Sequence, residues 1–229
     1  SLYAKHLNKE LVSKGKKFNL ISVVRELKKI EVDDQDSSPA FQKLEVKLKN
    51  LKIIENGPLR AIIRLDYHSQ SQSTIHGEIV LYHATPRIDF QVTLRCKERH
   101  LNISTSFHLN TTPKKISSEI PFGSHSFSFD SKETSPIVAN KWMALQETSE
   151  GVCFLSSLPS EYSINRGAVS LKLLQTHSIP RHSKATKDID LSFYNIGEQT
   201  CSYAFYPKKG EWKAWETHRA AGILHKLSR

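Results

Sequence analysis

The chain has 229 residues, and its 33 lysines and arginines outnumber its 23 aspartates and glutamates, which gives a net charge of +10 with neutral histidines. A hydrophobic content of 38% and a charged content of 24% are typical of a globular protein and exclude a disordered chain. No apolar run approaches the roughly 20 residues that a membrane-spanning helix requires, so we expect no membrane partner.

Alternating apolar and polar residues predict β-strands along most of the chain, after a first segment, residues 2–11, that is a weak helix candidate. At residues 43–53, lysines alternate with aliphatic residues, which is typical of a half-buried strand whose lysines face water. The turn residues at 56–58 precede a strand at 58–67. On the apolar face of that strand we expect Leu59, Ala61, Ile63, Leu65 and Tyr67.

The clearest alternation lies at residues 87–95 and 101–109. The first of these strands is expected to turn inward Ile88, Phe90, Val92 and Leu94. Further strand-like runs occur at residues 124–129, 151–155, 168–174, 189–194 and 200–206. Residues 33–39 and 69–73 have the composition of loops. Many strands with closely spaced turn residues predict a mainly β fold, a large antiparallel β-sandwich.

The segment from residue 210 onward is the best helix candidate. On one face of that helix, at spacings of three and four, lie Trp212, Trp215, Arg219 and Ile223. Tryptophans stack on sugar rings or fill a core. For Trp142, Trp212 and Trp215 we favour packing in the core or against another domain. A domain contact predicts that at least one of the three indoles is exposed within an apolar patch.

A search for catalytic chemistry finds no phosphate-binding glycine loop, no nucleophile elbow and no spacing typical of metal ligands. Glycoside hydrolysis requires two carboxylates, and Asp89, Glu98 and Glu119 are the candidates in strand-like context. Asp89 lies on the polar face of its strand and is expected to be solvated. The group Glu98, Arg99 and His100 is expected to form a polar network at a strand end. We therefore expect no catalytic residue and no metal ligand in this chain.

Charge and cysteines bear on partners and compartment. The basic residues are scattered, so solvated faces are favoured over a polyanion site, and we expect no nucleic-acid partner. Cys96, Cys153 and Cys201 are odd in number, far apart and without a CxxC motif. This pattern predicts reduced thiols and a cytoplasmic location, with Cys153 and Cys201 buried in their strands.

Several short strings recur in a fixed order: NGPLRA at residues 56–61, PRIDF at 86–90, ERH at 98–100, EIPFG at 119–123, NKW at 140–142 and YAFYP at 203–207. In this order and spacing they resemble the α-mannosidases of glycoside hydrolase family 38. The opening SLYAK, residues 1–5, is similar to the first hairpin of the family's C-terminal region, and GEWK at 210–213 is similar to its last helix. Together the strings span nearly the whole chain.

The resemblance implies the large C-terminal β super-sandwich, similar to the galactose-mutarotase type, of a zinc-dependent retaining glycosidase. In the family the zinc ligands and the nucleophile belong to an N-terminal catalytic domain. We therefore expect residues 1–229 to be a single sandwich domain cut from a larger hydrolase, with no cofactor of its own. The implied partners are its own catalytic domain and mannosides. Candidate carbohydrate or domain contacts are Arg87, Asp89, Glu98, His100, Trp142, Trp212 and Trp215.

Two functional hypotheses follow. In the first, the chain supports a catalytic domain and completes one wall of its substrate cleft. In the second, it is a free-standing carbohydrate-binding module whose concave sheet face holds a sugar through Trp142 and polar strand residues. The length of the reading frame upstream of residue 1 separates the two. A third, weaker hypothesis is a basic domain for polyanions, which salt-dependent retention on heparin or DNA resin would reveal.

Overall fold

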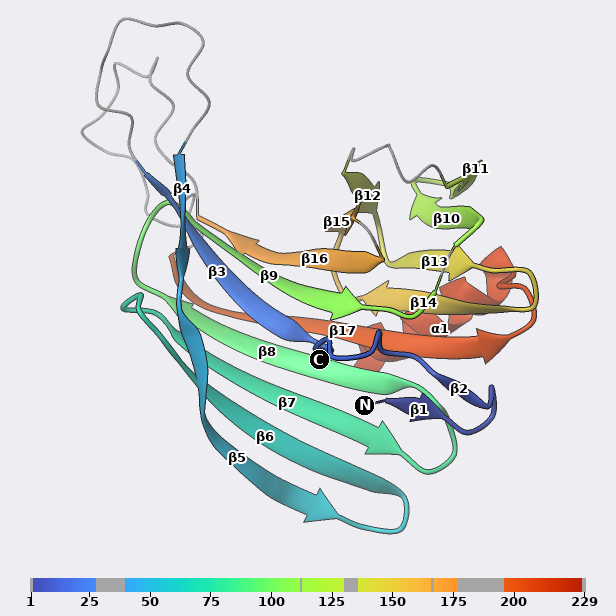
Figure 1. Cartoon of the computed structure of the whole chain (residues 1–229), viewed down its shortest axis with the longest axis horizontal. Helices are drawn as coiled ribbons and strands as arrows, with labels where there is room; N and C mark the ends of the chain where they lie inside the picture. Colours follow the sequence, from blue (N-terminus) through green and yellow to red (C-terminus); the bar gives the residue numbers. More distant parts are fainter. Residues whose placement is uncertain are drawn as a thin grey trace, which may run out of the picture.

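A computed structural model describes residues 2–27, 40–111, 113–129, 136–165, 167–176 and 196–227, without the side chains of residues 214, 215 and 225–227. Nearly all of its regular elements are strands (Figure 1). They are β1 (Tyr3–Ala4), β2 (Lys9–Glu10), β3 (Leu20–Leu27), β4 (Ala40–Leu44), β5 (Val46–Asn56), β6 (Arg60–Ser69), β7 (Thr74–Tyr82), β8 (Ile88–Cys96), β9 (Leu101–His108), β10 (Lys115–Ile120), β11 (Gly123–Ser128), β12 (Ile137–Ala139), β13 (Trp142–Gln146), β14 (Glu150–Ser156), β15 (Ser160–Asn165), β16 (Ala168–Gln175) and β17 (Gly197–Lys209), followed by the helix α1 (Ala214–Leu227). The predicted mainly β fold with a short C-terminal helix is confirmed.

The described strands form a nine-stranded sheet, a six-stranded sheet and the small hairpin β1–β2. The larger sheet has the order β11-β10-β13-β14-β17-β8-β7-β6-β5, and the smaller has the order β12-β15-β16-β9-β3-β4. Neighbouring strands pair antiparallel throughout these sheets. Apolar side chains from both sheets share one core cluster, which makes the architecture a β-sandwich.

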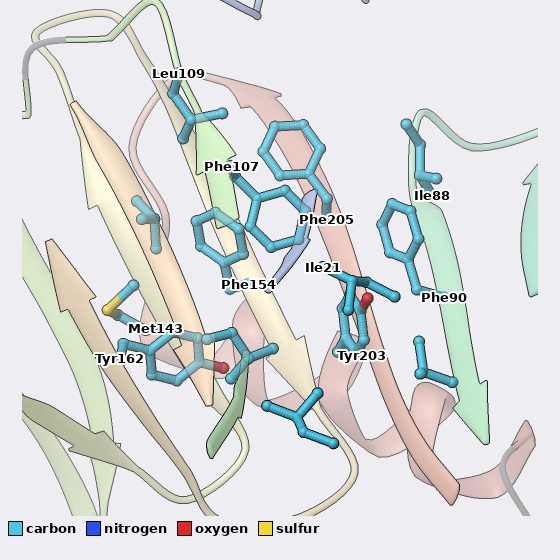
Figure 2. Packing of buried hydrophobic residues seen from close by; sticks show 14 of the residues in the cluster. Ile21, Ile88, Phe90, Phe107, Leu109, Met143, Phe154, Tyr162, Tyr203 and Phe205 are labelled. Atoms are coloured by element: carbon cyan, nitrogen blue, oxygen red, sulfur yellow. The ribbon is translucent and has the colours of Figure 1, made fainter. Parts of the chain in front are cut away.

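Aromatic rings fill the core between the two sheets. Phe107 on β9 lies with its ring centroid 5.0 Å from that of Phe154 on β14 and 6.3 Å from that of Phe205 on β17 (Figure 2). Phe90 on β8 stacks on Tyr203 at 5.1 Å. We call the face of the nine-stranded sheet that carries these rings its inner face, and the opposite one its outer face. The inward alternation predicted for β8 and β9 is confirmed.

A buried amide joins the two sheets. Asn19, just before β3, accepts hydrogen bonds at 2.7 Å from the hydroxyl of Thr105 on β9 and at 2.7 Å from that of Tyr203 on β17. Its backbone has a positive φ of 55°, a conformation that asparagine adopts more readily than most residues. One side chain therefore satisfies two buried hydroxyls on opposite layers.

Helix α1 covers the outer face of the nine-stranded sheet over β13, β14 and β17. The residues packed between helix and sheet are Trp142, Ala144, Cys153, Leu155, Ala204, Trp212, Ala220, Ala221 and Leu224. The predicted helix face with Trp212, Arg219 and Ile223 does not form, because Trp212 precedes α1 and is buried, whereas Arg219 and Ile223 are exposed. The alanines of the buried face are small, so they let the helix approach the sheet closely.

The first residues form a hairpin and not the weak helix predicted for residues 2–11. Strands β1 and β2 pair through Tyr3 with Glu10 and Ala4 with Lys9. The turn between them is closed by a hydrogen bond from the amide of Leu7 to the carbonyl of Ala4, 3.0 Å. A helix this short is marginal in water, whereas the hairpin suggested by the family resemblance packs Ala4 into the core.

Strands β5, β6 and β7, which we call the wing, form one end of the nine-stranded sheet (Figure 1), and burial decreases from β7, whose Ile75 belongs to the core, to β5 at the edge. The half-buried strand predicted at residues 43–53 is largely wrong, because β5 is exposed over most of its length. Leu59, expected on an apolar face, is also exposed. The physical reason is position: β5 is the edge strand, and no described element covers it.

Other expectations are confirmed, corrected or lie outside the described residues. Residues 70–73 form the predicted loop. The three cysteines are free, with Cys96 and Cys153 buried and Cys201 only partly so. Residues 33–39 and 189–194 lie outside the described part of the chain. Within that part, no helix has the length and hydrophobicity needed to cross a membrane.

Candidate functional site between the helix and the outer sheet face

A buried ion pair stands at the start of β8, on the outer face of the sheet. The Arg87 Nε atom lies 2.7 Å from Asp89 Oδ1, and Nη2 donates a hydrogen bond of 2.8 Å to Oδ2. The two side chains are 8% and 9% exposed. The expectation that Asp89 would be solvated is therefore wrong. A carboxylate tolerates such burial when a guanidinium fork neutralises it through two contacts.

The environment of this pair shifts the pKa of Asp89. Burial raises the pKa of Asp89, and the charge and hydrogen bonds of Arg87 oppose that shift without cancelling it. Tyr82 at the end of β7 lies beside the pair, with its ring centroid 5.6 Å from Arg87 Cζ. Burial and the nearby Asp89 carboxylate raise the pKa of Tyr82. The pair thus has an aromatic wall on one side.

A groove of about 520 Å³ runs between this pair and helix α1. Its lining consists of Tyr82, Thr85, Arg87, Tyr206, Lys208, Trp212, Glu216, Arg219, Ala220 and Ile223. These residues come from β7, the segment before β8, β17 and α1. The groove is concave and mixes aromatic, aliphatic and charged groups, as ligand sites commonly do.

On the side of the groove formed by β17 and α1, Lys208 contacts both a carboxylate and an indole ring. Its ammonium forms an ion pair with Glu216 in the first turn of α1 and lies 5.1 Å from the ring centroid of Trp212. The hydrogen bond from Lys208 lowers the pKa of Glu216. The ring of Trp212 also packs edge-on against Tyr206, with centroids 5.1 Å apart. These contacts fix the lysine, the carboxylate and the indole relative to one another.

The structure brings two of the predicted site residues, Arg87 and Trp212, to the lining of the groove, and Asp89 lies behind Arg87 as its ion-pair partner. Trp142 lies beneath α1 and is buried, with its indole nitrogen unpaired. Trp212 is also buried, so neither of these two indoles is the exposed one that the domain-contact hypothesis predicted among the three. The side chain of Trp215 lies outside the described part of the structure.

Glu98 and His100 lie just beyond the opposite end of β8. At the rise per residue of an extended strand, the length of β8 separates them from the groove by about 30 Å. The carboxylate of Glu98 pairs with Arg25 at 2.5 Å and accepts a hydrogen bond of 2.6 Å from the amide of Gln72. His100 has a positive φ of 62°, and its amide donates to the carbonyl of Thr176. Glu98 thus makes polar contacts at the strand end, and His100 takes part through its backbone amide; both are separate from the groove.

Sequence reasoning missed Tyr82, Lys208 and Glu216. The signal for Lys208 was available, because it follows Tyr206 by two residues on β17 and so shares its outward face. Glu216 lies in the first turn of a predicted helix, where acidic residues are common. Tyr82 carried no signal of its own, since only the pairing of β7 with β8 places it near Arg87.

The groove offers the chemistry of ligand binding. Its lining carries the Glu216 carboxylate, which is paired with Lys208, and the Arg87 guanidinium, which is paired with the buried Asp89, and such charged groups can hold hydroxyl groups through hydrogen bonds. Among the described residues, no three His, Cys, Asp or Glu side chains converge to hold a metal ion. The described side chains therefore do not fit a zinc ion.

Comparison with known proteins bears on this site. A family model described as the glycosyl hydrolases family 38 C-terminal domain matches residues 1–183. The curated relative α-mannosidase G from Dictyostelium discoideum is 26% identical over 187 residues, which covers 77% of this chain and 16% of that protein. The chain thus spans about a sixth of the length of this relative.

Two solved structures from Enterococcus faecalis share the fold. One is a protein in glycosyl hydrolase family 38, with a TM-score of 0.65, 10% identity, and coverage of 90% of this chain and 28% of that chain. The other is an α-mannosidase, with a TM-score of 0.68, 9% identity, and coverage of 91% and 28%. At these identities the likeness concerns the fold, and the chain corresponds to little more than a quarter of either structure.

Proposed function

The chain belongs to the C-terminal domains of glycosyl hydrolase family 38, and from this premise we propose that it serves a larger α-mannosidase-type hydrolase. In that enzyme it buttresses the catalytic domain and forms one wall of the substrate cleft. The observation that carries the proposal is the family match over residues 1–183. Its support from geometry is the groove beside α1, where Arg87, Lys208 and Glu216 present groups that bind hydroxyls.

The finer chemistry is part of the same proposal. Zinc dependence and a retaining mechanism are properties proposed for the catalytic domain of the parent enzyme, and no reaction step is assigned to this chain. A cytoplasmic location is proposed as well. It is supported by three free thiols, since secreted domains commonly pair their cysteines.

Activity of the full-length hydrolase and of the 229-residue chain tests this proposal. We expect the full-length protein to hydrolyse an aryl α-mannoside in a reaction that a chelator stops and zinc restores. The 229-residue chain alone is expected to be inactive with or without zinc. Turnover by the chain alone, abolished by a chelator, would overturn the assignment of the chemistry to another domain.

The contribution of the groove is tested by Arg219→Ala in the full-length enzyme. Arg219 is exposed at the rim, so its removal leaves the fold intact. If the groove forms part of the substrate cleft, KM rises several-fold while kcat changes little. Lys97→Ala, an exposed cation at the other end of β8, is the matched control and should leave both constants unchanged.

A second candidate function is carbohydrate binding by the chain alone, which the same groove favours. Trp142 is buried and cannot stack on a sugar, so that version of the module hypothesis is wrong. In the groove version, methyl α-mannoside should shift the NMR resonances of Trp212 and Tyr206, and Arg219→Ala should weaken the shifts. Absence of any shift in the chain, with activity in the full-length enzyme, favours the first function.

A further inference from the structure

The inner face of the nine-stranded sheet stays apolar as far as the edge strand β5, where no described residue packs over it. Leu48 on β5 pairs in register with Tyr67, which pairs with Ile75, which pairs with Leu94 on β8. Residues directly opposite in paired strands share one face of a sheet. Leu94 and Ile75 are 1% and 0% exposed, whereas Leu48 is 50% exposed. The row is thus buried at the centre and open at the edge.

Two further rows repeat this gradient. Leu51 pairs with Leu65, whose row reaches Val92, and Ile53 pairs with Ile63, whose row reaches Phe90. Val92 and Phe90 are each 2% exposed, whereas Leu51 is 56% and Ile53 is 58% exposed. We call Leu48, Leu51 and Ile53 the apolar edge. Three large aliphatic side chains of one strand therefore face the core side of the sheet without cover from any described residue.

The outer face of the same strands carries exposed charged residues. Lys52 pairs with Arg64, and Arg64 forms an ion pair of 2.7 Å with Glu78 on β7. Asp66 lies 2.7 Å from His76 in the next row. Such exposed ion pairs are typical of a solvated surface. On β5 itself, the outer-face residues paired with β6 are polar, namely Lys47, Asn50, Lys52 and Glu55, so the apolar edge is a feature of the inner face of this strand.

The strand edge itself is poorly suited to pair with another strand. Two irregularities in the pairing, between Leu48 and Asn50 and between Ile53 and Glu55, interrupt the regular ladder of β5. Exposed lysines at Lys47, Lys49 and Lys52 line the strand as well. Bulges and lysines are common devices that prevent edge pairing. A partner is therefore expected to contact the inner face and not the edge.

We infer that the apolar edge is the docking surface for another part of the same hydrolase polypeptide. The part that docks there presents an apolar surface rimmed by carboxylates. This inference rests on the proposed function, since it needs a longer parent protein. The matched solved structures are more than three times as long as the aligned chain, so relatives carry ample further sequence. A second copy of this chain is disfavoured, because it would bring the lysines of two β5 strands and two net charges of +10 together.

Thiol labelling of two neighbouring positions tests the inference. Leu51→Cys places a thiol on the inner face of β5, and Lys52→Cys places one on the outer face of the same strand. In the 229-residue chain, both thiols should react with a maleimide at similar rates. In the full-length hydrolase, Leu51→Cys should react at least about tenfold more slowly, while Lys52→Cys keeps its rate. Within the 229-residue chain background labelling is small, since Cys96 and Cys153 are buried and burial raises the pKa of Cys201 to about 11, and labelling of the full-length protein without either substitution gives its background rate.

The outcomes separate this inference from the proposed function. Equal labelling of both thiols in the full-length protein overturns the docking surface, whatever the enzyme hydrolyses. Protection of Leu51→Cys in a full-length protein that does not cleave α-mannosides upholds the docking surface and overturns the proposed activity. A reading frame with no further segment overturns the inference. So does protection of Leu51→Cys that grows with the concentration of the isolated chain, which would identify a second copy as the occupant.

Discussion

The centre of the nine-stranded sheet and its wing are built from the same kind of strand but have different surroundings. Strands β8, β14 and β17 carry the six-stranded sheet on their inner face, and α1 packs over β14 and β17 on the outer face. The wing strands β5 to β7 form one end of the sheet (Figure 1), where β7 still contributes Ile75 to the core but β5 is exposed over most of its length. Alternation sets which way a side chain points, and only the layer above decides whether it is buried.

The two regions also differ in how they satisfy polar groups. The centre buries the Arg87–Asp89 pair and the Asn19 amide, each with its partners close by. The outer face of the wing uses exposed pairs such as Arg64 with Glu78. Buried pairs cost much when one partner is lost, and exposed pairs cost little. A substitution should therefore have a large effect in the centre and a small one in the wing.

Leu94→Ala should have the largest effect on the stability of the chain. Leu94 is fully buried on β8 between the two sheets, and its removal leaves a cavity that packed neighbours fill only in part. We expect a loss of about 2–5 kcal/mol in the free energy of unfolding. Urea denaturation followed by tryptophan fluorescence measures it. A loss below about 1 kcal/mol would mean that the centre is not closed.

Asn19→Gly should cost about 2–3 kcal/mol, because it leaves the buried hydroxyls of Thr105 and Tyr203 without their acceptor. Glycine adopts the positive φ of this position without strain, so the loss reports the hydrogen bonds. Asn8→Gly is the matched control, since Asn8 has a positive φ of 53° at an exposed turn. If both variants lose the same stability in urea denaturation, the amide does not hold the sheets together.

The sequence allowed the fold class and the inward face of β8 to be predicted, because alternation is a local property of the chain. Cover is not local. Strand β17 inserts beside β8 from far along the sequence, and this order leaves β5 at an edge. Lysine alternation on β5 therefore indicated a half-buried strand, although both its faces are exposed. The burial of Asp89 was missed for the same reason, since Ala204 of β17 is its neighbour in the sheet.

The family motifs located Arg87 and Trp212, which line one groove, and Asp89, which forms a buried ion pair with Arg87. They also pointed to Glu98 and His100, which lie at the other end of β8. Order and spacing along the chain indicate membership of a family but not which motifs meet in space. Lys208 and Glu216 were missed because their pairing depends on how α1 returns along β17.

Two aspartates should titrate in opposite directions in the two regions. Burial raises the pKa of Asp89 in the centre, and the hydrogen bond from His76 lowers the pKa of Asp66 in the wing. Proton binding to Asp89 favours the folded state, so its contribution to stability rises as the pH falls through its folded pKa. The contribution of Asp66 is present above its unfolded pKa and is lost as the pH falls through its lowered folded pKa.

A carboxyl-carbon NMR titration of the folded chain measures both groups. The midpoint for Asp89 should lie above the ordinary range of an aspartate, and the midpoint for Asp66 should lie below it. His76→Gln should move the midpoint of Asp66 towards the ordinary value and leave that of Asp89 unchanged. The same midpoint for both aspartates would contradict the difference in their surroundings.

Leu48→Ala should have the smallest effect, although Leu48 lies in the same cross-strand row as Leu94. Half of its surface is already in water, so truncation forfeits only part of a leucine's burial and creates no closed cavity. We expect a loss of no more than about 1 kcal/mol in the isolated chain, measured by the same urea denaturation as Leu94→Ala. A loss equal to that of Leu94→Ala would show that the inner face of the wing is already packed. In the full-length hydrolase the two losses should converge, because the proposed docking segment would then cover Leu48 as the six-stranded sheet covers Leu94.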